Sequence, residues 1–257
     1  MRSVGAIFVF AIAAFLANSF VFGTVLLGPS RLGFFTYQAL CDISQMLDSP
    51  LLCIEKLPFT IQSRTMTGQF AVHITSSLAI GFACAFPYSF WEIWRFVKPG
   101  LHDNEQDVSR GATFGVTALF MLGIFFGYFV VTPLSVNFLS NYQVDPSIIN
   151  EIDITSYINT VVAITLACGI MFQLPMVVFF LSKVGIVTPD ILRTYRRHAI
   201  VIIVLIGAVI TPPDVFSQVL VAIPVSLLYE ASIIISRRVE KKRARELEAV
   251  LQGKQDD

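Results

Sequence analysis

The chain has 257 residues, of which 55% are hydrophobic and 14% are charged, and its mean hydropathy is +0.72. This composition argues against a soluble globular protein, and the balance of 18 basic and 18 acidic residues gives no net charge that would favour nucleic acid. Several apolar runs approach the roughly 20 residues that cross a hydrocarbon core of about 30 Å. No β-barrel alternation is present, so we expect a helical membrane bundle.

Six transmembrane helices are predicted in chain order, and together they make one all-α membrane domain. The first is too long for the apolar segment of a cleaved signal peptide, which is the alternative interpretation. Pro87 should kink the second span, Pro133 should end the third, and Pro175 interrupts the fourth. The fifth has only about twelve apolar residues, or about 18 Å, so its neighbours should shield it. The predicted spans are residues 4–27, 70–97, 111–134, 158–181, 199–210 and 215–236.

Two longer loops are expected on one side of the membrane. The first, of about forty residues, follows Pro29, and the second runs from Ser135 to Tyr157. Within the first loop, residues 33–47 are predicted to form a surface helix against the bundle. The apolar residues at helical spacing are Phe34, Tyr37, Leu40, Ile43 and Leu47.

Basic residues indicate the orientation. Fifteen of the 18 Lys and Arg residues fall on the side that carries both termini, and three (Arg31, Lys56 and Arg64) fall on the other. The positive-inside rule therefore places both termini in the cytoplasm. We interpret the basic tail, residues 237–257, as a solvated anchor that can also contact anionic lipid, at about 1 kcal/mol per basic residue.

No arrangement of side chains indicates an enzyme. The three histidines, His73, His102 and His198, lie on different segments, and no GxSxG, HExxH or glycine-rich phosphate loop is present. Cysteine and histidine spacings typical of a metal site are also missing from the sequence. We therefore predict no catalytic residue, no cofactor and no metal.

The four cysteines divide into two pairs. Cys84 and Cys168 lie in apolar runs, where packing explains them. Cys41 and Cys53 share the first outer loop, and the residues alone leave open whether they form a disulfide.

Polar residues in or near the membrane are candidate functional residues. Gln173 lies in mid-span, where its amide can bond a freed carbonyl or a neighbouring helix, for structure or for function. Glu92 is expected to pair with Arg95 at the interface. Glu230 either neighbours Arg237 or points inward.

Two loops carry further polar candidates. Asp214 is expected to cap the last helix. Asp103, Glu105 and Asp107 form an acidic patch that would suit a guanidinium ligand, although the residues alone favour a solvated loop.

Residues 86–105, FPYSFWEIWRFVKPGLHDNE, contain both tryptophans of the chain, at a predicted membrane surface. This segment resembles the TatC family, whose pattern is P-x-x-x-Y-Q-x-W-x-F-x-x-P-(A/G)-L-x-x-x-E; Trp91 and Glu92 replace the usual Tyr and Gln. A second segment, TPPDVFSQVLVAIPVSLLYEASI at 211–233, is similar to the signature near the C-terminus of the family. Shorter matches are YFVVTPL, DITSYI, FQLPMVVFFL and GIVTPDILRTYRRHAIV. The resemblance covers nearly all of residues 70–238.

The resemblance implies a function that the residues alone do not. TatC proteins are receptors of the twin-arginine translocase in the bacterial inner membrane, where they bind signal peptides of folded precursors. It further implies assembly with TatA- and TatB-type single-span partners, a homo-oligomeric complex among membrane lipids, and transport driven by the proton-motive force.

The resemblance also implies roles for individual residues. Glu105 would meet the arginines of the signal peptide, beside Trp94, Arg95, Pro99 and Leu101. Gln173 occupies the intramembrane polar position of the family. The edge that docks partners would comprise Ile206, Thr211, Pro212, Asp214 and Gln218.

The chain departs from the family pattern at its start, and two other functions were considered. The family opens with an amphipathic segment like HLxELRxRL, whereas Met1-Arg2-Ser3 stands where that segment should have ended. We expect a truncated start; the alternative is that the protein recognises signal peptides with half of the usual site. A small-solute secondary transporter would show inverted repeats, and the two halves show no convincing similarity. An intramembrane hydrolase would need a nucleophile–base pair.

Overall fold

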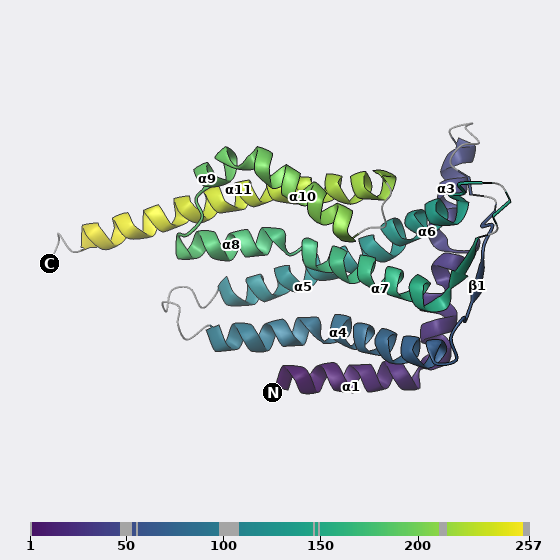
Figure 1. Cartoon of the computed structure of the whole chain (residues 1–257). Helices are drawn as coiled ribbons and strands as arrows, with labels where there is room; N and C mark the ends of the chain where they lie inside the picture. Colours follow the sequence, from purple (N-terminus) through teal and green to yellow (C-terminus); the bar gives the residue numbers. More distant parts are fainter. Residues whose placement is uncertain are drawn as a thin grey trace.

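A computed structural model describes residues 2–46, 53–54, 56–97, 108–145, 147–148, 150–210 and 215–253. Long helices lie side by side, and α3 crosses one end of the bundle beside a strand pair (Figure 1). We call this the outer end. Helix α1 begins and α11 ends at the opposite, inner end.

The first predicted span is broken. Helix α1 (Arg2–Leu16) ends near Ala17, and the chain bends by 77° into α2 (Asn18–Phe20) and the π-helical η1 (Val21–Leu26). The expectation of one uninterrupted helix over 4–27 is therefore wrong. Hydropathy reports only how apolar a segment is, and it cannot locate a bend.

Two more elements lie at the outer end. The 3-10 turn η2 (Gly28–Ser30) leads into α3 (Phe35–Met46), which confirms the predicted surface helix. Strands β1 (Thr60–Gln62) and β2 (Glu151–Asp153) pair in parallel, with Ile61 opposite Ile152. Neither strand was predicted from the sequence.

Helix α4 (Gly68–Val97) continues through Pro87 to the inner end of the bundle. The third span lies within a continuous helical segment of α5 (Val108–Phe126), the π-helical η6 (Gly127–Val131) and α6 (Thr132–Asn141). The prediction that Pro133 ends this helix is wrong, because the loop expected from Ser135 begins as helix. Pro133 is tolerated because the Phe129 carbonyl, one turn before it, accepts a hydrogen bond from the Thr36 hydroxyl instead.

The fourth span is divided into α7 (Ile154–Met171) and α8 (Leu174–Val184), with Pro175 in the first turn of α8. A short helix, α9 (Pro189–Thr194), precedes α10 (Arg196–Ile210) and the long α11 (Val215–Gly253). Helix α11 carries the basic tail as a direct continuation of the last span.

Within the described residues, four helical segments are long and apolar enough to cross a membrane, and the bent α1–η1 pair would be a fifth. Helix α10 has 15 residues, in line with the expectation of a short fifth span. The protein is thus an integral membrane protein built mostly of helices.

Glycines set the closest helix contacts. A Cβ at Gly81 of α4 would lie 2.7 Å from the Ala11 backbone nitrogen of α1. A Cβ at Gly123 would lie 2.6 Å from the Cys168 carbonyl oxygen, and one at Gly127 would lie 2.9 Å from the Cys168 Cβ. Gly123 and Gly127 form a GxxxG pair, so α5 and η6 approach the α7 backbone closely.

Candidate functional site

The inner half of α4 presents a row of aromatic and charged side chains. Tyr88, Trp91, Glu92 and Arg95 follow one another at helical spacing, and Trp91 is 45% exposed. The Arg95 guanidinium carbon lies 5.8 Å from the centroid of the Trp91 ring, a cation–π geometry. We call these four residues the α4 inner surface.

Glu92 has a different partner from the one expected. Its Oε1 accepts a hydrogen bond from the Tyr88 hydroxyl at 3.1 Å, while Arg95 lies against Trp91. The expected i,i+3 ion pair of Glu92 with Arg95 is therefore replaced by an i,i+4 hydrogen bond and a ring contact. The guanidinium is left exposed at the end of the helix.

Much of the predicted signal-peptide site lies outside the described residues. This applies to Pro99, Leu101 and Glu105, and to the side chain of Trp94. Arg95 is the one predicted member whose side chain the structure describes.

Gln173 lies at the break between α7 and α8. Its Nε2 donates to the Val116 carbonyl oxygen of α5 at 3.1 Å. Of the two bonding partners expected for the amide, the neighbouring helix is the one that the structure shows. The polar side chain therefore stabilises a helix contact at mid-depth in the span.

The predicted docking edge lies along α10. Ile206 is 44% exposed and helps line an apolar groove of about 370 Å³ between α7, α8, α10 and α11. Gln218 of α11 donates through Nε2 to the Val204 carbonyl of α10 at 3.2 Å, so it joins these two helices to each other. Thr211, Pro212 and Asp214 lie outside the described residues.

Comparisons with known proteins agree with this architecture. The family Sec-independent protein translocase protein (TatC) matches residues 1–224. The chain is 34% identical over 245 residues to the Sec-independent protein translocase protein TatC of Blattabacterium sp. subsp. Periplaneta americana (strain BPLAN), covering 95% of this chain and 92% of that protein.

The chain belongs to the TatC family. It is also 39% identical over 171 residues to TatC of Aquifex aeolicus (strain VF5), covering 66% of this chain and 71% of that one. A crystal structure of the twin-arginine translocase receptor TatC aligns with a TM-score of 0.61 at 31% identity, over 93% of this chain and 98% of that chain. The protein is therefore a component of the Sec-independent translocase, a multi-protein transport complex, and the family is not one of enzymes.

Two contacts in this TatC family member were not found from its sequence. Arg196, at the start of α10, forms an ion pair with Glu230 of α11, so Glu230 neither pairs with Arg237 nor turns inward. The buried Tyr229 hydroxyl donates to the Leu192 carbonyl of α9 at 2.6 Å. The paired charges were visible in the sequence, but 34 residues separate them, and only tertiary packing brings them together.

The outer end of this TatC fold is held by hydrogen bonds to irregular backbone. The buried Tyr37 hydroxyl of α3 lies 2.9 Å from the carbonyl oxygens of both Pro29 and Pro133. The Tyr128 hydroxyl donates to the Val25 carbonyl at 2.6 Å. Burial raises the pKa of Tyr37, so its phenol stays protonated and keeps donating.

Cys41 and Cys53 are joined by a disulfide, with their Cα atoms 4.2 Å apart. In the strand pair, the Asp153 carboxylate accepts from the backbone N–H groups of Arg64, at 3.0 Å, and Thr155, at 2.9 Å. These bonds lower the pKa of Asp153 from its ordinary value of 3.8. Asp153 is also the N-cap of α7, so it ties the strand pair to that helix.

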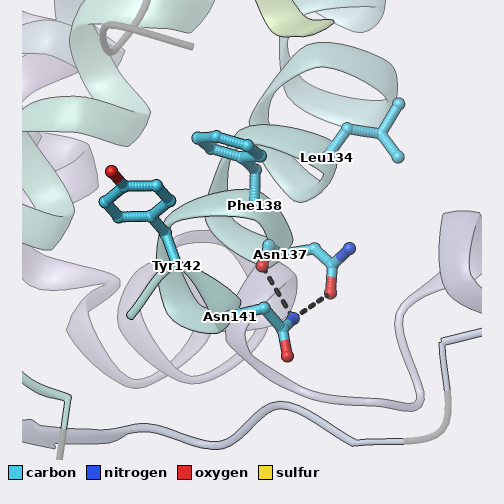
Figure 2. A pocket seen from close by; sticks show the side chains of 5 residues that line it. All are labelled: Leu134, Asn137, Phe138, Asn141 and Tyr142. Carbon is cyan, nitrogen blue, oxygen red and sulfur yellow. Dashed lines mark hydrogen bonds between the residues drawn. The ribbon is translucent and has the colours of Figure 1, made fainter. Parts of the chain in front are cut away.

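A shallow pocket of about 370 Å³ lies along α6 (Figure 2). Figure 2 shows the Phe138 and Tyr142 rings beside each other, and the amides of Asn137 and Asn141 lying together. Asn141 Nδ2 lies 2.8 Å from both the carbonyl oxygen and Oδ1 of Asn137. These amide contacts stay within one helix, and we assign the pocket no ligand.

Proposed function

We propose that this protein is the signal-peptide receptor of a twin-arginine translocase. In this proposal Glu105 binds the arginines of the signal, beside the α4 inner surface and with Trp94, Pro99 and Leu101. A carboxylate accepts the planar guanidinium fork through two bonds, whereas a Lys ammonium cannot form that geometry. The observation that carries the proposal is family membership together with an exposed aromatic and cationic surface directly before residues 98–107.

The proposal also includes the orientation of the receptor and the membrane in which it lies. Both termini face the cytoplasm of a bacterium, and the protein lies in its inner membrane. The basic residues support this orientation, because Arg2, Arg95 and the start of α10 lie toward the inner end, whereas Arg64 bonds Glu151 at the outer end.

Partner assembly is a further part of the proposal. Single-span TatA- and TatB-type proteins bind along α10, where Ile206 faces the apolar groove. Thr211, Pro212, Asp214 and Gln218 complete that edge in the proposal. The assembled homo-oligomeric complex transports folded precursors using the proton-motive force.

A photo-crosslinker placed at position 105 tests the receptor role. We expect strong crosslinking to a precursor with Arg-Arg in its signal and weak crosslinking with Lys-Lys. Glu105→Gln in a chain with the crosslinker at position 101 should weaken the Arg-Arg adduct, and Asp42→Asn, an exposed acid on α3, serves as the matched control. Equal adducts with both signals would reject the receptor role.

A further inference from the structure

A second pocket lies at the outer end, where η1, η2, the start of α3 and η6 meet. Its volume is about 470 Å³, and we call it the Arg31 pocket. Its walls are largely aromatic, with one arginine. The lining residues are Gly23, Thr24, Val25, Gly28, Arg31, Gly33, Phe34, Phe35, Tyr128 and Phe129.

The Arg31 pocket lies at the level of a membrane surface. Tyr128 lies eighteen residues after Arg110 in the continuous α5–η6 segment, a distance of about 27 Å at 1.5 Å per residue. This is close to the roughly 30 Å of a hydrocarbon core. We place Arg110, one of the fifteen basic residues expected on the side of the termini, at the inner interface. The pocket then opens at headgroup level, where aromatic rings and arginine are both favoured.

Arg31 supplies an exposed cation to this pocket. The other described outer arginine, Arg64, is paired with Glu151, whereas no carboxylate in the described part of the chain pairs with Arg31. The Tyr128 hydroxyl is already bonded to Val25. The guanidinium is thus suited to an anion, and none of the residues that line the pocket is an acid that could receive the amine of a zwitterionic headgroup.

Two glycines keep the pocket open. A Cβ added at Gly23 or Gly33 would meet no atom within 4 Å, so each position borders free space. Phe34 and Phe129 stack with ring centroids 5.7 Å apart, and Phe35 lies edge-on to Phe129. The result is an apolar cleft with a cation beside it, which matches an acyl chain joined to a phosphate.

We propose that the Arg31 pocket binds an anionic phospholipid of the leaflet at this end, with its phosphate on Arg31 and an acyl chain along the Phe35 and Phe129 rings. The site is independent of the signal-peptide role. A bound lipid would contact both η1 and η6.

The test uses the full chain in lipid nanodiscs with a phosphatidylglycerol that carries a photo-reactive group near its glycerol. Adducts are mapped by mass spectrometry to residues 20–35 and 126–131, and adducts on the basic tail serve as the internal reference. We expect each of two variants to lower the yield of the pocket adduct about tenfold. Arg31→Gln removes the charged hydrogen bond to the phosphate, and Gly23→Leu fills the space for the lipid.

Matched controls separate the site from general effects. Lys56→Gln removes another outer cation, and Gly5→Leu adds a side chain where a Cβ likewise meets no atom within 4 Å. Both should retain the pocket adduct. An unchanged adduct in Arg31→Gln and Gly23→Leu would overturn the proposal. Equal adducts from phosphatidylcholine, or loss of the adduct with soluble glycerol phosphate, would also overturn the assignment to an anionic lipid.

Discussion

At the scale of the residue, Gln173 shows how an uncharged polar group can be held inside a span. Its amide nitrogen donates to a backbone carbonyl of a neighbouring helix, so that donor is satisfied inside the span. The sequence indicated that Gln173 was important, but it could not name Val116, which is 57 residues away.

Gln173→Leu should lower the free energy of unfolding by about 1 kcal/mol, because one hydrogen bond is lost.

Denaturant titrations in micelles measure this effect as the difference in the free energy of unfolding between Gln173→Leu and wild type. Ile170→Leu, a change at an exposed position one turn away, is the control and should match wild type. A Gln173→Leu variant as stable as wild type would show that the hydrogen bond to α5 does not stabilise the fold.

At the scale of the element, hydropathy found the spans, while glycine contacts decided how they pack. The GxxxG pair of α5 and η6 was present in the sequence, yet its partner, the Cys168–Gly169 region of α7, follows only from the fold. The positions of prolines predicted helix ends poorly. Pro133 lies inside a continuous helical segment and Pro175 in the first turn of α8, and neither ends a helix.

Gly123→Ala should destabilise the protein by about 1–3 kcal/mol, because the added carbon would lie 2.6 Å from a backbone oxygen that cannot move alone. Gly115→Ala, in the same helix, would meet only the flexible Met176 side chain at 3.4 Å and should be tolerated. Thermal unfolding of both variants in the same detergent makes the comparison. Equal melting temperatures would contradict the close α5–α7 contact.

At the scale of the whole molecule, the outer and inner ends differ in the interactions that stabilise them. The outer end carries the strand pair, the tyrosine bonds to irregular backbone and the Cys41–Cys53 disulfide. Toward the inner end, α9 and α10 are tied to α11 by one ion pair and the Tyr229 hydroxyl. The ion pair is largely exposed and is expected to contribute no more than about 1 kcal/mol.

The proposed orientation predicts the labelling of the cysteines in intact cells stripped of their outer membrane. A membrane-impermeant maleimide should label Cys41 and Cys53 only after reduction, because the disulfide persists on the oxidising side. A cysteine introduced as Gln252→Cys should react only after the membrane is ruptured. The opposite pattern would invert the topology.

The sequence by itself determined the class of the protein, its apolar spans, the short fifth helix, the surface helix of the first loop and, through its motifs, the family. These features depend on local hydropathy, spacing and residue identity, which are readable without a fold. The bend at Ala17, the continuation past Pro133, the ion pair of Arg196 with Glu230, the partner of Gln173 and the Arg31 pocket were decided only by the tertiary structure. Each depends on segments far apart in the chain, whose contacts form when helices pack and satisfy each other's backbone groups.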